Sequence, residues 1–200
     1  MTKDFKEISK VLGLDVSTKT IGWALFDSDS KQLLELTHIS PIIKEKNIPK
    51  MKELFQKSDI FRTKLEQYVN LNIQKVVIEE PLLNSNNIYT IQTLMRYNTL
   101  ISKEIYDVLG IVPEYISTYN SRKNAFPWLV KENDKGKFVL FGGLPKDCDK
   151  KQIVWEQVAK REPQINWVYT KNNTLKKENY DMSDAYCCVL GFMKQEKFWT

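Results

Sequence analysis

Four acidic residues stand at points of the sequence where a charged side chain is expensive to place. Asp15 follows the apolar run 12–14, and Glu79 ends the apolar run 76–78. An ionised carboxylate beside a core is costly to desolvate unless something compensates it. Asp181 and Asp184 lie three residues apart on the first turn of a predicted final helix, so their side chains share a face. Four carboxylates could therefore converge on one site.

Converging carboxylates repel one another unless a divalent cation lies between them. Hard oxygen ligands of this type suit Mg²⁺, for which Mn²⁺ can substitute. Two such ions about 4 Å apart would activate a water molecule and stabilise the departing oxygen in phosphodiester hydrolysis. The acidic residues therefore predict a site with two metal ions, which needs no histidine or cysteine nucleophile.

Each carboxylate also has a purely structural interpretation. Asp15 could accept hydrogen bonds from the turn that follows it, and Glu79 could be a solvated strand end. Asp181 or Asp184 could cap a helix or favour its dipole. The joint placement of the four residues favours the metal site. Alternation along a strand sends Glu79 and Glu80 to opposite faces, so only one of them should be a ligand.

Hydrophobic patterning predicts the elements that must position these residues. Apolar runs at 11–16 and 21–26 predict a β-hairpin, and 32–39 predicts a third antiparallel strand, which leaves Asp15 near the end of a central strand. Further strands are predicted at 76–78 and 111–117, a loop at 170–179, and helices at 49–70, 87–109, 119–128, 150–161 and 180–197. This order predicts an α/β fold with an RNase H-like mixed five-stranded sheet, three antiparallel strands then parallel ones, flanked by helices.

Length and composition indicate one globular domain over residues 1–200. The chain is 42% hydrophobic and has 30 Lys and Arg against 25 Asp and Glu, a net charge of +5. This charge mildly favours a polyanionic partner, although an ordinary lysine-rich surface would give the same value. Three cysteines fit neither a disulfide framework nor a zinc site. With no apolar leader and no stretch as long as a membrane span, we expect a cytoplasmic protein without membrane contact.

Three motifs resemble the nuclease motifs of RuvC-type Holliday junction resolvases, in the family's order: VLGLDVSTKTIGWALFD, VVIEEP and YDMSDAYCCVLGF. Between them, the chain resembles the family's dimer helix with its following strand and basic turn, and then its next helix: SNNIYTIQTLMRYNTLISKEIYDVLGIVPEYISTYNSRKNAF and KKQIVWEQV. The resemblance covers nearly the whole chain from Val11 onwards. It implies an RNase H-type fold and a metal-dependent endonuclease that cuts four-way DNA junctions as a homodimer.

The resemblance also implies roles for particular residues. The metal ligands would be Asp15, Glu79 rather than Glu80, Asp181 and Asp184. Lys151, and less closely Lys123, match lysines that the family places near the scissile phosphate. The implied DNA contacts are the basic residues Arg122, Lys123, Lys150 and Lys151 and the side chains Leu82, Leu83 and Tyr89.

Two features depart from the family or extend it. Leu82 and Leu83 stand where members often carry an aromatic wedge, so these leucines or Tyr89 would open the junction. Residues 129–147 predict a basic hairpin insertion, which could contact phosphates or be a solvated loop.

The helix at 87–109 carries more apolar positions than one core-facing stripe needs, which favours a homodimer. The alternative is that the surplus apolar side chains pack under the 129–147 insertion. The apolar positions of the 87–109 helix are Ile91, Leu94, Met95, Tyr97, Ile101, Ile105 and Val108.

Other functions share some of these features. A strand with Gly-x-Asp and a Ser/Thr turn also opens sugar kinases of the actin-like fold, but these normally need two such domains and a glycine-rich loop, and this chain has seven scattered glycines. Another RNase H-fold nuclease, acting on flaps, branched DNA or RNA–DNA hybrids, would use the same carboxylates. A junction-binding protein without activity would keep the fold but need not keep all four acids.

Overall fold

A mixed five-stranded sheet forms the middle layer of the molecule. The computed structural model describes residues 9–81, 87–133, 135–145 and 147–196. The strand order is β3-β2-β1-β4-β5. The strands are β1 (Lys10–Val16), β2 (Ile21–Asp27), β3 (Leu33–Ile39), β4 (Ile73–Glu79) and β5 (Glu114–Ile116). β1 pairs antiparallel with β2, which pairs antiparallel with β3, whereas β1–β4 and β4–β5 are parallel. The predicted fold class is confirmed.

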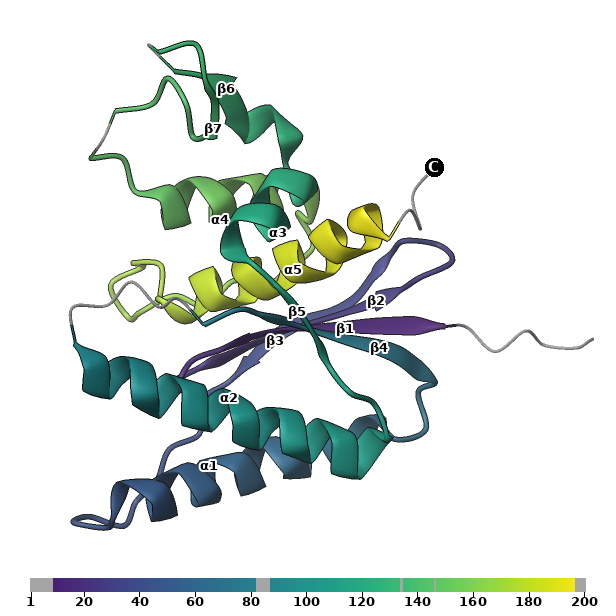
Figure 1. Cartoon of the computed structure of the whole chain (residues 1–200), viewed down its shortest axis with the longest axis vertical. Coiled ribbons are helices and arrows are strands. Elements are labelled where there is room, and N and C mark those ends of the chain that lie inside the picture. The colour runs from purple at the N-terminus through teal and green to yellow at the C-terminus, as the bar shows by residue number, and fades with distance from the viewer. Residues whose placement is uncertain (1–8, 82–86, 134, 146, 197–200) are drawn as a thin grey trace, which may run out of the picture.

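Helices cover both faces of this sheet (Figure 1). One face carries α1 (Lys50–Leu65), the short 3-10 helix η1 (Glu66–Tyr68) and α2 (Ile88–Leu109). The other carries α3 (Thr118–Ala125), α4 (Lys150–Arg161) and α5 (Glu178–Gln195). Beyond α3 lie the 3-10 helix η2 (Pro127–Leu129) and a hairpin of β6 (Val130–Glu132) and β7 (Phe138–Leu140).

Alternation along β1 decides which layer each of its side chains faces. Leu12 and Leu14 belong to the core beneath α1 and α2, while Val11 belongs to the core beneath α5. A Cβ on Gly13 would also meet α5. Asp15 has the same parity as Val11 and Gly13, so it points toward α5.

Two glycines allow the α5 backbone to lie directly on the sheet. A Cβ on Gly22 would come within 2.0 Å of the Asp181 carbonyl oxygen, and one on Gly13 within 2.6 Å of the Ala185 carbonyl oxygen. Gly22 is also the register partner of Asp15 on the neighbouring strand. The close approach therefore brings the start of α5 to the end of β1.

Most predicted elements are present, with shifts that have physical causes. The helix predicted over 119–128 divides at Phe126 into α3 and η2, because the residue before Pro127 disfavours the helical region. The last helix starts at Glu178 rather than 180, and the Asn179 amide binds the backbone of Val168. Asp184 therefore lies in the second turn of α5, so its predicted place on the first turn is wrong.

The hairpin within 129–147 forms as predicted, but it lies on the α3–α5 side of the sheet, away from α2 (Figure 1). The idea that surplus apolar residues of α2 pack beneath it is therefore wrong. In the part of the chain that the structure describes, every helix is too short or too polar to cross a membrane.

Replacing Gly22 with alanine should destabilise the protein by about 3 kcal/mol or more, because the new methyl group would overlap the α5 backbone at Asp181. Gly143→Ala is the matched control. Gly143 has a φ of 73° but open space around its Cβ position, so its substitution should cost only the left-handed backbone penalty of about 1–2 kcal/mol. Chemical denaturation of both variants measures the difference, and equal stabilities would contradict the close packing.

Candidate active site

Three carboxylates meet where β1 and β4 end against α5. Asp15, Glu79 and Asp184 each offer one oxygen, and these oxygens all lie within 4.8 Å of one another. β1 and β4 are parallel neighbours, so their carboxyl ends reach the same edge of the sheet. α5 adds Asp184 from above that edge. The structure thus brings together three of the four carboxylates that the sequence singled out.

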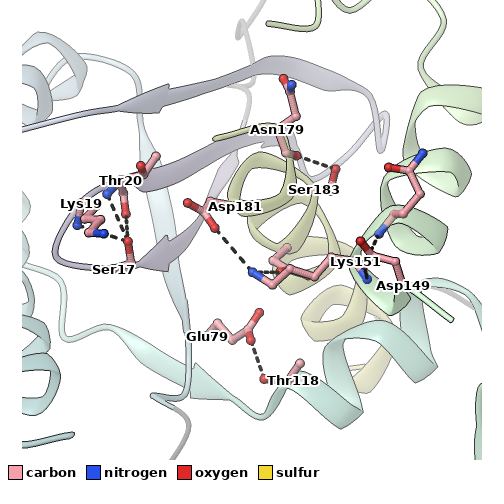
Figure 2. Close-up of polar contacts among 12 residues, drawn as sticks. Ser17, Lys19, Thr20, Glu79, Thr118, Asp149, Lys151, Asn179, Asp181 and Ser183 are labelled. Atoms are coloured by element: carbon pink, nitrogen blue, oxygen red, sulfur yellow. Dashed lines mark hydrogen bonds and ion pairs between the residues drawn. The ribbon is translucent and has the colours of Figure 1, made fainter. Parts of the chain in front are cut away.

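The fourth predicted carboxylate, Asp181, lies beside these three and is connected to them through Lys151. The Lys151 ammonium lies 3.7 Å from an oxygen of Asp181 and 3.7 Å from an oxygen of Asp184. Figure 2 shows Lys151 reaching from α4 toward Asp181 on α5. The start of α4 is fixed by Asp149, whose carboxylate accepts the backbone N–H groups of Lys151 and Gln152.

Two residues of α3 bind carboxylates of the cluster. The Arg122 guanidinium donates to Asp184 Oδ1 from Nε at 3.0 Å and from Nη2 at 2.8 Å, and Nη2 also donates to Oδ2 at 3.0 Å. Thr118 donates its hydroxyl to Glu79 Oε1, as Figure 2 shows. The other oxygen, Glu79 Oε2, is buried with no hydrogen-bond partner among the described residues.

Arg122 and Thr118 differ from what the sequence led us to expect. Arg122 was predicted to contact DNA, but the structure buries it against Asp184, with 8% of the residue exposed. Sequence reasoning missed Thr118, which resembles an ordinary residue at a helix start. The available signal was the spacing of four that puts a hydroxyl and a guanidinium on one face of a helix after the last strand.

Burial and repulsion between charges make Asp15, Glu79 and Asp181 harder to ionise. Burial raises the pKa of Asp15 well above its usual value, and the charges of Glu79, Asp184 and Asp181 raise it further. Burial first and then Asp184 raise the pKa of Glu79 to about 7. Burial raises the pKa of Asp181 to about 6, against the opposing effect of Lys151. A cation placed among these oxygens would lower these pKa values, because it favours the ionised carboxylates.

The ligand atoms fit a hard divalent cation. All three of the clustered ligands are carboxylate oxygens, as Mg²⁺ and Mn²⁺ prefer, and the unpartnered Glu79 Oε2 is a buried acceptor that a cation would satisfy. Two cysteines on α5, Cys187 and Cys188, are also buried, and burial raises the pKa of both thiols. Neutral thiols are poor ligands, so the carboxylates define the site.

The other predicted DNA contacts lie on the surface or outside the described residues. Lys150 and Lys123 are exposed, and the Lys123 ammonium lies 5.5 Å from the centroid of the Tyr119 ring. Tyr89, with 77% of its surface exposed, lines a pocket of about 370 Å³ with residues of the turn after Asp15. Leu82 and Leu83 fall outside the described residues.

Solved structures with the same fold include Thermus thermophilus RuvC. A T. thermophilus RuvC in complex with a Holliday junction substrate matches with a TM-score of 0.60 and 10% identity, over 95% of this chain and 97% of that one. A second T. thermophilus RuvC structure matches with a TM-score of 0.54 and 12% identity, over 94% and 96% of the two chains. A human cytomegalovirus terminase nuclease domain gives a TM-score of 0.41 at 12% identity, over 94% and 84%.

No protein-family model and no curated protein sequence matches the chain. At 10–12% identity, the similarity to RuvC shows the RNase H-like fold alone.

Metal-free protein should lose stability as the pH rises from about 5 to 8. The pKa values of Glu79 and Asp181, about 7 and about 6, lie above those of the unfolded chain, so ionisation at higher pH opposes folding. Asp15→Asn removes one repelling charge and should raise the melting temperature at pH 8 in EDTA, by about 2–4 °C for each kcal/mol relieved. Thermal melts across this pH range measure the effect. A lower melting temperature for Asp15→Asn at pH 8 would show that the carboxylates do not repel.

Proposed function

We propose that this protein is a metal-dependent endonuclease that cuts branched DNA, with four-way (Holliday) junctions as its preferred substrate. The observation that carries the proposal is the convergence of Asp15, Glu79 and Asp184 at one edge of an RNase H-like sheet. The fold of a RuvC solved with a Holliday junction substrate supports the choice of substrate.

The carboxylates would hold the metal ions, and Lys151 would meet the phosphate. Asp15, Glu79, Asp184 and the adjacent Asp181 are the proposed ligands for two Mg²⁺ ions, or Mn²⁺ in their place. When bound, the metal supplies an activated water molecule and stabilises the departing oxygen. The Lys151 side chain is 49% exposed while its ammonium lies near Asp181 and Asp184, so it can reach from these acids toward a phosphate.

DNA would be held by side chains around this edge of the sheet. We propose Lys150 and Lys123 as phosphate contacts, because both are exposed on the helices that carry Lys151 and Thr118. Tyr89, at the start of α2, is the proposed apolar contact, together with Leu82 and Leu83 of the preceding segment. The DNA contact predicted for Arg122 stays a prediction; the structure shows its guanidinium bonded to Asp184.

The active unit would be a homodimer formed through α2. This helix buries Tyr97, Ile101 and Ile105 in the core but leaves large apolar side chains exposed at Ile88, Met95 and Tyr106. A four-way junction presents two strands related by approximate two-fold symmetry, and a two-fold dimer would place one acidic site at each.

A cytoplasmic location remains a prediction.

Glu79→Gln should abolish cleavage, whereas Glu80→Gln, which changes the exposed neighbouring glutamate in the same way, should leave it nearly unchanged. Loss of a metal ligand should lower kcat by more than the roughly 100-fold that is lost when a residue hydrogen-bonded to a metal ligand is changed. The assay uses labelled four-way, flap, linear and RNA–DNA hybrid substrates with Mg²⁺, Mn²⁺, Ca²⁺ or EDTA. Full activity in excess EDTA, or an active Glu79→Gln with an inactive Glu80→Gln, would refute the assigned site.

Light scattering and a supercoiled cruciform assay test the substrate and the assembly. We expect a dimeric mass and cleavage of both strands within one binding event, because each protomer offers one acidic site. Met95→Glu should yield monomers that nick one strand, since it places a charge on the apolar surface of α2. A wild-type monomer that cuts flaps or hybrids faster than junctions would instead indicate another type of RNase H-fold nuclease.

A further inference from the structure

α3 contacts the acidic cluster from the side, through two residues on one of its faces. Thr118 and Arg122 are four residues apart, so they lie one above the other on the helix. Thr118 binds Glu79, and Arg122 binds Asp184. One short helix thus contacts a carboxylate from the sheet and a carboxylate from α5.

The position of α3 is fixed at both of its ends. It begins directly after β5, where Ile116 pairs with Glu79 and its carbonyl accepts the N–H of Glu80. Along its length it lies against α5, because a Cβ on Gly191 would come within 2.6 Å of the Ser121 Cα. Asn124 adds a hydrogen bond of 3.2 Å to the Gly191 carbonyl. The Thr118 and Arg122 side chains therefore start from a backbone that cannot shift freely.

The two bonds leave specific oxygens for a cation. Thr118 donates to Glu79 Oε1, while the buried Oε2 has no partner among the described residues and is available to bind a metal. Arg122 makes three hydrogen bonds to the two oxygens of Asp184, which fixes the plane of that carboxylate. An ionised carboxylate has about four lone-pair sites, so Asp184 can accept Arg122 and still bind a metal.

We infer that Thr118 and Arg122 are positioning residues of the active site, which hold Glu79 and Asp184 in the orientation that binds the divalent cation. The inference deepens the proposed nuclease function and rests on it for the role of the metal. Replacing a residue that hydrogen-bonds a metal ligand typically lowers metal affinity or activity by about 10- to 100-fold. A purely structural role, in which the bonds only attach α3 to the sheet and α5, would leave metal affinity unchanged.

Thr118→Val is the sharpest variant, because it removes the hydroxyl, keeps the shape and changes no charge. We expect its dissociation constant for Mn²⁺, measured by calorimetry without DNA, to rise by about 10- to 100-fold. Thr118→Ser, which restores the hydroxyl, should recover wild-type affinity. Thr63→Val is the matched control, because the exposed Thr63 hydroxyl donates to the carbonyl of Asp59 on α1, and its Mn²⁺ affinity should not change.

Arg122→Lys tests the second contact while keeping the positive charge. A lysine lacks the planar fork that fixes the plane of the Asp184 carboxylate through three hydrogen bonds, so the Mn²⁺ dissociation constant should rise by about tenfold. Arg62→Lys on α1 is the control for the same change at a surface ion pair. Arg122→Gln removes the positive charge as well as the contact. If Arg122 acted only as a nearby positive charge, its loss would tighten Mn²⁺ binding.

Wild-type Mn²⁺ affinity in Thr118→Val, or tighter binding in Arg122→Gln, would overturn the inference. Because these titrations contain no DNA, the result is separate from the test of the substrate. If the wild-type protein cuts none of the substrates but Thr118→Val weakens Mn²⁺ binding and Thr118→Ser restores it, the proposed nuclease function fails and the positioning role stands.

Discussion

Repulsion among buried carboxylates is the constraint on which the rest of this structure depends. Asp15, Glu79 and Asp184 place oxygens within 4.8 Å of one another at the end of the sheet, and burial raises the pKa of Glu79 to about 7. Such a cluster opposes folding when it is ionised and unoccupied. Arg122 and Lys151 offset part of the charge. A hard divalent cation placed among these oxygens would neutralise the negative charge that remains.

The surrounding elements act mainly to impose this arrangement. Parallel pairing of β1 with β4 brings Asp15 and Glu79 to one edge, although they are far apart in the sequence. Gly13 and Gly22 let α5 lie on the strands closely enough for Asp184 to join them. The hydrophobic cores on both sides of the sheet supply the stability that this polar edge costs.

Hydrophobic patterning was sufficient to predict the strands, the order of the helices and the strand-end positions of Asp15 and Glu79. It could not show that Arg122 binds Asp184, because that ion pair joins positions 62 residues apart and a basic residue near a nuclease motif resembles a phosphate contact. The role of Thr118 was hidden for a related reason, since a threonine at a helix start resembles a cap. The start of α5 was misplaced because the hydrogen bonds of Asn179 to Val168 are tertiary.

A crystal of the protein soaked with Mn²⁺ and measured at the manganese absorption edge tests the central claim most directly. Anomalous scattering locates the ion without any assumption about substrate or activity. We expect a manganese peak bound by oxygens of Asp15, Glu79 and Asp184, with Thr118 and Arg122 still bonded to their carboxylates. Manganese bound only elsewhere on the molecule, with these three carboxylates left without an ion, would contradict it.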